Sequence, residues 1–452
     1  MFRHGLPALL VTLASLLVPS LVGGQSTFRP VVPGTGDAIR PDELEALGRA
    51  IGGRRIVLLG ENGHGVGEFT TAKVGLVEWL RDALSFEVVV MESGFFECAH
   101  AWDGARRSTP RRLLYDCLKY PFQHAEILPL FERIRDWRDT ERPLELAGMD
   151  LQAQGFDSGD RPEAMHAVLS RHAPALARRV AAYDSALYLV ADSGGMAPEA
   201  LRPWLLEHHA EVRAAYDSAA ALTAGTERWT FELSVGLVDR LLVSARAEVA
   251  GTGRPPRYGE LRDEWMARAV AAVADSIAGA RKVVVWLHND HARYGANGRG
   301  DERTRTVGGY LREWYGDEVF SIGFFMGQGV IADNGRTERQ VDTPPENGVE
   351  AFLGSAGYDA GYLILTGSRD PEVIRWASSP RGYLRAGLTP REMVPADEFD
   401  ALFWVRRVGP PEYSIPDPSL RHLESQLPAG PPRAHSQKGR DEEDRRARRR
   451  PQ

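Results

Sequence analysis

The chain has 452 residues and a formal net charge of −7, with 43% apolar and 26% charged residues. These proportions are typical of a globular protein that can bury a sizeable core. Its two cysteines are too few for a disulfide scaffold or a four-thiolate zinc site. The mildly acidic balance gives no reason to expect a nucleic-acid partner. Collagen-like, disulfide-framework and polytopic membrane classes are therefore excluded.

Residues 1–24 predict an export signal. The chain has a basic residue, Arg3, near its start, continues with an apolar stretch from Leu6 to Val22, and reaches a Gly-Gly pair where cleavage is expected. An uncleaved membrane anchor is the alternative, but Pro7 and Pro19 interrupt the stretch, which is short for a span of about 20 residues. We therefore expect an exported protein, periplasmic or extracellular, with no stable membrane association beyond the signal.

Export also bears on the two cysteines, Cys98 and Cys117, because an oxidising compartment permits a disulfide between them. We expect this bridge, and two buried free thiols are the alternative. At the other end of the chain, residues 428–452 are mostly polar and end in a dense charge run, HSQKGRDEEDRRARRRPQ. Such a run cannot bury a core, so this tail is expected to be disordered.

Short apolar runs rich in β-forming residues recur along the chain and predict the strands of a sheet. They lie at Arg55–Gly60, Glu87–Glu92, Leu144–Met149, Lys282–Leu287, Val319–Phe325, Gly361–Leu365 and Leu402–Val405. Most of these runs are separated by segments with helical spacing. This pattern is typical of a mostly parallel sheet covered by helices on both faces, so the predicted fold class is α/β.

Between residues 156 and 280 the strand signals vanish, and long segments rich in Ala, Leu and Arg follow one another with helical spacing. We interpret this interval as an inserted helical cap over one edge of the sheet. The insertion divides the predicted α/β core into a first part, residues 28–155, and a second part, residues 281–420.

Ionisable residues follow four of the predicted strands at the point where each strand ends. The sequences are GENGHG at residues 60–65, ESG at 92–94, DLQ at 150–152 and HNDH at 288–291. In a parallel sheet these ends share one edge, and ligands bind at that edge in open α/β folds. Four such ends in succession predict a functional site.

The helix expected after the first of these strands carries a lysine on its apolar face. Phe69, Leu76 and Leu80 recur at helical spacing, and Lys73 falls in the middle of the stripe that they define. An unpaired buried ammonium is costly, so Lys73 either reaches water along its stem or finds an anionic partner. If the amine is buried, Glu61 or Glu92 is the expected partner.

Several reaction types lack their motif in this chain. There is no G-x-S-x-G sequence for a serine nucleophile and no phosphate-binding P-loop, although the glycines of GENGHGVG leave phosphate binding as a weak alternative. Two histidines among carboxylates can instead activate water. A neutral His that is oriented by a Glu takes a proton from water. A second His then donates a proton to the leaving group or stabilises the negative charge that develops.

A metal site is the alternative use of the same residues. His64, Glu68, His288 and His291 have spacings, H-x-x-x-E and H-x-x-H, that permit a divalent metal able to activate water. Neither spacing is a strong metal signature. Glu68 is also compatible with a structural role as a carboxylate at the N-terminus of a helix. His291 is also compatible with a position behind the residues that contact the ligand.

Taken in order, these residues resemble a known family. GENGHGVGEF, VVMES, GMDLQ, RDEWMA (Arg262–Ala267), WLHNDH and VGGYLREWYGDEVFSIGFF are similar to successive segments of the erythromycin esterase family, between about residues 40 and 407. The resemblance implies an α/β core with a helical cap, a cleft between them, and metal-independent hydrolysis of a macrolide lactone by activated water. It also implies a link to antibiotic resistance.

The resemblance further implies roles for particular residues. His64 is the general base and Glu61 its partner, Glu92 lies beside them, and His288 is the second catalytic histidine. Lys73 occupies a position where the macrolide-hydrolysing members usually have Arg, which binds through a planar fork that Lys lacks. The family's more distant relatives include metal-dependent proteases, so the metal alternative stays open.

We therefore expect an exported hydrolase that cleaves a small-molecule ester or lactone with water activated by His64, without a cofactor or metal. The predicted catalytic residues are His64, Glu61, Glu92 and His288, and the predicted substrate-binding residues are Lys73, Glu68, Asp150 and His291. The alternatives are a metal-dependent hydrolase at the same residues and a non-catalytic extracellular protein that binds a ligand in the cleft.

Overall fold

The computed structural model describes residues 28–31, 40–152, 161–191, 202–253, 255–277, 279–296 and 303–415. The predicted export signal and the predicted charged tail lie outside the described residues. None of the described helices combines the length and the apolar character that crossing a membrane requires.

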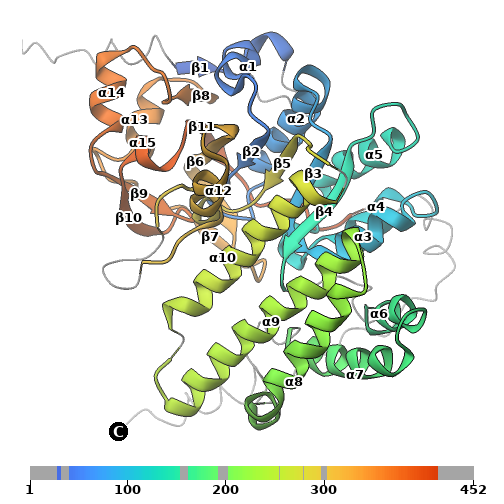
Figure 1. Ribbon diagram of the computed structural model, residues 1–452. Helices are drawn as coiled ribbons and strands as arrows, with labels where there is room; N and C mark the ends of the chain where they lie inside the picture. Colours follow the sequence, from blue (N-terminus) through green and yellow to red (C-terminus); the bar gives the residue numbers. More distant parts are fainter. Residues whose placement is uncertain are drawn as a thin grey trace, which may run out of the picture. The chain divides into compact units, whose positions relative to one another are not determined.

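Nine of the described strands form one sheet at the centre of the fold (Figure 1). They are β1 (Phe28–Pro30), β2 (Ile56–Leu59), β3 (Val88–Gly94), β4 (Glu145–Asp150), β5 (Val283–Trp286), β6 (Val319–Ala332), β7 (Glu338–Gln340), β8 (Ala360–Ile364) and β11 (Ala401–Val408). The order is β1-β8-β11-β6-β2-β5-β3-β4, with β7 paired to β6. The six strands from β11 to β4 are parallel to one another, whereas β8, β1 and β7 pair antiparallel. The predicted α/β class with a mostly parallel sheet is confirmed.

Helices cover both faces of this sheet because the side chains of each strand alternate in direction. Val57 and Leu59 of β2 belong to a core that includes α1 (Glu45–Ile51), α2 (Gly67–Leu84), α4 (Pro110–Cys117) and α5 (Leu128–Trp137). Ile56 and Leu58 belong to a core on the opposite face. The helices of that second core are α10 (Pro256–Ala271), α12 (Val307–Tyr315), α13 (Val349–Ser355) and α14 (Pro371–Ala377).

The described chain between β4 and β5 contains helices and no strand, in the interval for which the sequence predicts an insertion. Its helices are α6 (Arg161–Ser170), α7 (Pro174–Ala191), α8 (Arg202–Ala221), α9 (Gly225–Ala250) and α10. The first four pack around a third core, whose centre includes Tyr216 and Phe231. In Figure 1 they lie below the sheet, and α10 runs from them back to it.

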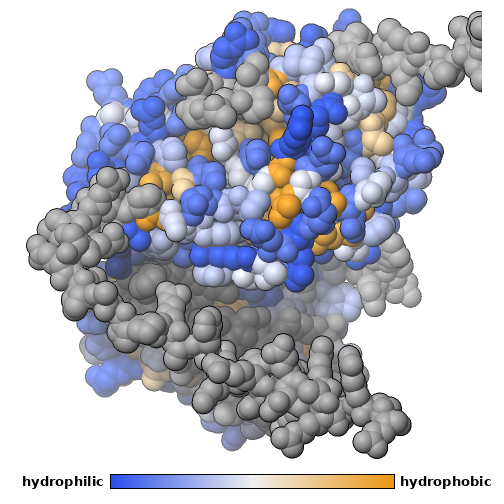
Figure 2. Space-filling view, turned by 180° about the vertical axis from the view of Figure 1, so that it is seen from behind, coloured by the Kyte–Doolittle hydropathy of each residue, from blue (hydrophilic) through white to orange (hydrophobic). Residues whose placement is uncertain are grey.

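The remaining described elements are short. Besides short 3-10 and π helices, they are α3 (Phe95–Gly104), α11 (Asn289–Ala292), α15 (Pro395–Glu398) and the hairpin of β9 (Arg381–Arg385) and β10 (Thr389–Met393), which forms a separate two-stranded sheet. The face seen in Figure 2 is mostly hydrophilic, with hydrophobic side chains in scattered patches. Such scattered patches are normal on a folded protein and need no partner.

Candidate active site

The loop between β2 and α2 carries Glu61 and His64. Glycines flank His64 for two different reasons: Gly63 has a φ of +135°, and Gly65 lies so close to Ala332 that a Cβ atom would come within 2.1 Å of its carbonyl oxygen. A side chain at either position would therefore strain the loop or push it away from β6. This close fit places the imidazole of His64 at the carboxyl edge of the sheet.

Glu61 orients the imidazole of His64. The Nδ1 atom of His64 lies 2.7 Å from Oε1 of Glu61, which is nearly fully buried. Burial alone raises the pKa of Glu61, but the charge of Lys73 and the hydrogen bond with His64 outweigh it and lower the pKa. An ionised carboxylate only accepts, so Nδ1 of His64 is the donor, and Nε2 of the neutral ring is left without a proton.

Lys73 supports Glu61 from behind. Its Nζ atom donates to Oε2 of Glu61 at 2.7 Å and lies 4.3 Å from the ring centroid of Trp286. Burial lowers the pKa of Lys73 to about 8, although the pairing with Glu61 opposes this effect. Of the two partners that the sequence suggests, Glu61 is therefore the one that the ammonium contacts.

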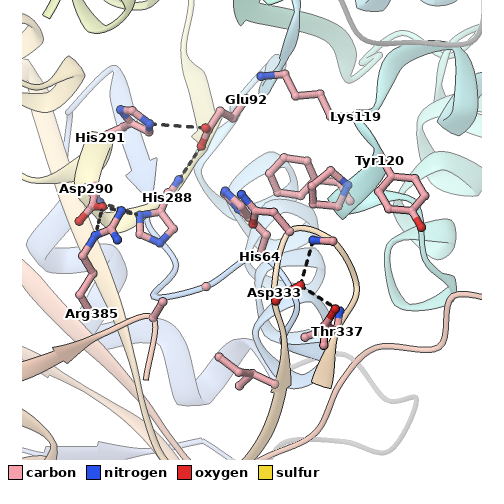
Figure 3. A pocket seen from close by; sticks show the side chains of 18 of the residues that line it. His64, Glu92, Lys119, Tyr120, His288, Asp290, His291, Asp333, Thr337 and Arg385 are labelled. Atoms are coloured by element: carbon pink, nitrogen blue, oxygen red, sulfur yellow. Dashed lines mark hydrogen bonds and ion pairs between the residues drawn. The ribbon is translucent and has the colours of Figure 1, made fainter. Parts of the chain in front are cut away.

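His288 lies between β5 and α11, opposite His64. The two imidazole rings are 5.1 Å apart between centroids (Figure 3). The Nδ1 atom of His288 accepts the backbone N–H of Asp290 at 3.0 Å, so the neutral ring carries its proton on Nε2. Burial lowers the pKa of His288 to about 4, with Asp290 opposing the shift. His288 is therefore a neutral hydrogen-bond donor above that pH.

Glu92, at the end of β3, joins this group through the backbone and through a cation. Its Oε2 atom accepts the backbone N–H of His288 at 2.8 Å, and its Oε1 atom accepts from Arg262 at 2.8 Å. Burial opposes ionisation, but the charges of His291 and Arg262 help to hold the pKa of Glu92 far below its usual range. Both carboxylate oxygens of Glu92 accept hydrogen bonds from the protein, so Glu92 holds other residues of the site in place.

Arg262 of α10 gathers the acidic side chains at the ends of β3 and β4. Besides Glu92, it donates to Asp150 through Nη2 at 2.5 Å, and to Nε2 of His291 through Nη1 at 3.0 Å. Asp150 also accepts from Lys119. His291 in turn has its Nδ1 atom 2.7 Å from Asp263. The guanidinium of Arg262 therefore connects α10 with β3, β4 and α11.

These side chains face a pocket of about 900 Å³. Its described lining includes Gly63, His64, Glu92, Lys119, Tyr120, Pro121, Phe122, Gln152, Arg262, His288, Asp290, His291, Ile331, Ala332, Asp333, Asn334, Gly335, Thr337, Arg385, Ala386 and Leu388. Pockets of this size suit drug-sized molecules. Of the described residues of the insertion, only Arg262 lines the pocket, so most of its wall comes from loops of the α/β core rather than from the cap helices that we expected.

The structure brings the four predicted catalytic residues together, while the predicted substrate-binding residues are divided. His291 lines the pocket. Lys73 and Asp150 lie behind its wall, with side chains that are almost fully buried. Glu68 is not among the lining residues: its carboxylate accepts the backbone N–H of Gly409 at 2.8 Å, after the end of β11. These three residues therefore support the fold around the site instead of contacting a molecule in the pocket.

Several lining residues were not predicted from the sequence. Arg262 belongs to the RDEWMA segment, which resembles a segment of the family. However, no sequence spacing marks an Arg within a helix as a site residue. Lys119 and Arg385 come from segments that reach the sheet edge only through tertiary packing. Among the described residues, no group of three or more His, Cys, Asp or Glu side chains is arranged so that it could hold a metal ion.

Known proteins of similar sequence and structure allow the chain to be placed. Residues 75–408 match the family model described as erythromycin esterase. YbfO of Bacillus subtilis (strain 168), which is named as a hydrolase, is 22% identical over 403 residues, covering 81% of this chain and 87% of YbfO.

Three solved structures have a similar fold. The match to a succinoglycan biosynthesis protein has a TM-score of 0.71 and 19% identity, and it covers 87% of this chain and 97% of that protein. The match to a Bacillus cereus protein has a TM-score of 0.71 and 17% identity, and it covers 86% of this chain and 97% of that protein. The match to a mutant of the erythromycin esterase EreC in its open conformation has a TM-score of 0.62 and 16% identity, and it covers 86% of this chain and 100% of that protein. Identities this low show the fold alone. The family match over most of the chain carries the assignment: this protein belongs to the erythromycin esterase family of hydrolases.

Proposed function

We propose that this protein is an exported hydrolase that cleaves a carboxylic ester or lactone with water activated by His64. One observation carries the proposal: His64, which Glu61 orients, faces a pocket of about 900 Å³ with the neutral donor His288 opposite it. This arrangement supplies a general base and a hydrogen-bond donor on two sides of the carbonyl group that reacts.

The reaction then proceeds in two steps. Nε2 of His64 takes a proton from water while the water oxygen attacks the carbonyl carbon, and Glu61 stabilises the imidazolium that forms. The Nε2–H group of His288 donates to the oxygen on which negative charge develops. When the carbon–oxygen bond breaks, His64 returns its proton to the departing alkoxide. The products are an acid and an alcohol, or one hydroxy acid from a lactone.

Macrolide lactones are one substrate class to test, because family membership supports them and they suit a pocket of this volume. Simple esters are the other class, since Lys73 stands where macrolide-hydrolysing members usually have Arg. A link to antibiotic resistance follows only if a macrolide is the substrate.

A mass-spectrometric screen of macrolides and simple esters tests the proposal. Hydrolysis by the purified protein should fall by at least about 10²-fold in the His64→Ala variant, because a general base is lost. His172→Ala, which changes an exposed histidine of the insertion, is the matched control and should keep the full rate. An unchanged rate in His64→Ala contradicts the mechanism. Ligand stabilisation without any product would indicate the binding protein instead.

Export is supported by the apolar N-terminal stretch and by a disulfide between Cys98 and Cys117, a bond typical of oxidising compartments. Expression of the full chain in a bacterial host, followed by fractionation and mass measurement of the intact protein, tests it. We expect the protein outside the cytoplasm with a new N-terminus near residue 25. An intact N-terminus in the cytoplasmic fraction would contradict export.

A further inference from the structure

Four consecutive residues, Lys119–Phe122, line the pocket and form what we call the 119–122 wall. The ring of Phe122 contacts the imidazole of His64 edge-on, with centroids 4.6 Å apart. The wall contains only one short 3-10 helix, Tyr120–Phe122, with Pro121 inside it. So short an element has little stability of its own, and its position depends on its anchors.

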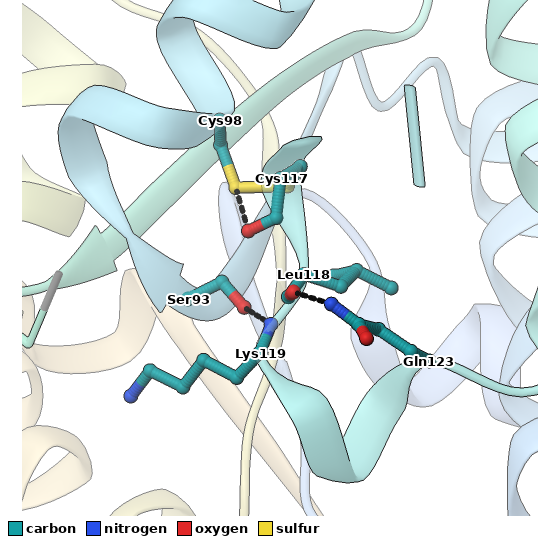
Figure 4. The surroundings of a disulfide bond; sticks show 6 residues. All are labelled: Ser93, Cys98, Cys117, Leu118, Lys119 and Gln123. Carbon is teal, nitrogen blue, oxygen red and sulfur yellow. Dashed lines mark hydrogen bonds between the residues drawn. A yellow bond between two sulfur atoms is a disulfide. The ribbon is translucent and has the colours of Figure 1, made fainter. Parts of the chain in front are cut away.

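The first anchor is covalent. Cys117, the last residue of α4, lies two residues before the wall and forms a disulfide with Cys98 of α3 (Figure 4). Both cysteines are fully buried. Because α3 begins directly after β3, the bond ties the start of the wall to the strand that carries Glu92 and Ser93 near its end.

Hydrogen bonds continue this anchor into the wall. The backbone N–H of Lys119 donates to Oγ of Ser93 at 3.1 Å, and the side chain of Gln123 donates to the carbonyl of Leu118 at 2.7 Å. Figure 4 shows both bonds next to the disulfide. The start of the wall is therefore held close to the end of β3, and the residues on its two sides are held to each other.

A second anchor holds the other side of the wall. Arg336, in the hairpin between β6 and β7, donates to the carbonyls of Tyr120 at 2.6 Å and Gln123 at 3.0 Å. Its guanidinium also lies 3.6 Å from the ring centroid of Tyr120. These contacts are non-covalent and break and re-form, whereas the disulfide is permanent as long as it is oxidised.

We propose that the Cys98–Cys117 disulfide positions the 119–122 wall, and that full activity of the site therefore requires the oxidised protein. Loss of the bond frees the end of α4, so Phe122 no longer holds its place against His64 and the pocket loses its shape. The enzyme would then be restricted to an oxidising compartment by its own pocket. The activity part of this inference rests on the proposed function, whereas the positioning part does not.

Hydrogen exchange of the full-length protein tests the positioning without any substrate. In the Cys98→Ala/Cys117→Val variant, amides of residues 118–123 should exchange at least about tenfold faster, while those of β5 keep their rate. Thr109→Ala is the matched control: it removes the cap at the opposite end of α4, where Oγ1 accepts the N–H of Arg112 at 3.1 Å. It should leave residues 118–123 unchanged.

Two exchange results would overturn the proposal. Unchanged protection of residues 118–123 in the double variant would show that the non-covalent anchors suffice. An equal loss of protection in β5 would show that the disulfide stabilises the whole fold and not this wall. Dithiothreitol gives the same comparison in the unmutated protein. It supplies two electrons and two protons to the sulfur atoms and becomes a cyclic disulfide.

Activity gives the second readout, with the best ester from the screen. The double variant should raise KM by about tenfold or more, because the wall is displaced, while Thr109→Ala keeps the KM of the unmutated protein. An unchanged KM and kcat in a double variant whose wall exchanges faster would overturn the link to activity. If no ester is hydrolysed by any form of the protein, the proposed function fails and the exchange result still decides the positioning.

Discussion

The Nζ atom of Lys73 donates a hydrogen bond of 2.7 Å to Oε2 of Glu61, and neither side chain is more than 2% exposed. The other oxygen of Glu61 is the partner of His64. The charge of Lys73 thus keeps ionised the carboxylate that orients the base, and Lys73 acts on the reaction through Glu61 without touching the pocket.

Replacing Lys73 with Met should lower the free energy of unfolding by about 3 kcal/mol, because Glu61 would keep its burial cost and lose its cation. Activity should fall as well, since a protonated Glu61 no longer holds Nδ1–H of His64. Lys73→Arg keeps the charge and should retain more of both. Urea unfolding and kcat measure the two effects, and equal stability of Lys73→Met and the unmutated protein would contradict the role of the ion pair.

Arg385 should affect the reaction through Asp290. Its Nε atom lies 2.5 Å from Oδ2 of Asp290, and this same oxygen is 3.5 Å from Nδ1 of His288. Burial raises the pKa of Asp290, but His288 and Arg385 outweigh burial and lower it to about 2. Without Arg385, more of this negative charge acts on His288 and favours its protonated form.

We therefore expect Arg385→Ala to raise the pH at which His288 takes up a proton, which NMR of its imidazole measures. Arg391→Ala, on the exposed strand β10 of the same hairpin, is the control and should leave that titration in place. An unmoved titration of His288 in Arg385→Ala would show that Arg385 does not act on His288.

His288 should also make the stability of the fold depend on pH. Burial lowers its pKa to about 4, against about 6.5 in the unfolded chain. Between these values the unfolded state binds a proton that the folded state does not, so stability falls as the pH drops through this window. The contribution lost between pH 7 and pH 4 is about 3 kcal/mol.

The His288→Gln variant isolates this contribution. Its unfolding free energy should decrease less between pH 7 and pH 4 than that of the unmutated protein, by an amount of that order. Denaturant unfolding at both pH values makes the measurement, because the other titrating groups are common to the two proteins. Parallel pH dependences of the two would disprove the assignment of a neutral, buried His288.

Chelation separates water activation by His64 from activation by a metal. We expect the hydrolysis rate to be unchanged in excess EDTA, because Nδ1 of His64 and both oxygens of Glu61 already have protein partners. Metal analysis of the purified protein accompanies the assay. Loss of activity on chelation, restored by a divalent metal, would favour the metal-dependent alternative.

The sequence predicts the central strands well and the peripheral ones poorly, for a physical reason. Strands buried on both faces, such as β2 and β5, need continuous apolar runs, and those runs are visible without a structure. The hairpin strand β10, Thr389–Met393, is exposed at four of its five positions and leaves no such run. β7 is exposed at all three positions and is missed for the same reason.

The residues of the site also fall into those that the sequence predicts and those that it misses. Glu61, His64, Glu92 and His288 directly follow or end parallel strands, so topology alone brings them to one edge. Lys73 could be flagged because an ammonium in an apolar helix face needs a partner. Lys119, Arg262 and Arg385 follow no such rule, because their positions depend on how a loop, a helix and a hairpin pack on that edge. The position of Glu68 outside the pocket lining could not be predicted for the same reason: its helix turns the side chain toward Gly409.

Arg262 stands on α10, the last helix of the insertion, yet its guanidinium binds Glu92 and Asp150 of the sheet. An engineer who wished to graft a relative's insertion onto this core should therefore cut the chain before Pro256 and keep α10 with the host. A graft that also exchanged α10 would replace Arg262 with a residue of the relative's helix. The position of that helix along the sheet would then decide whether the buried carboxylates of Glu92 and Asp150 are paired with an arginine.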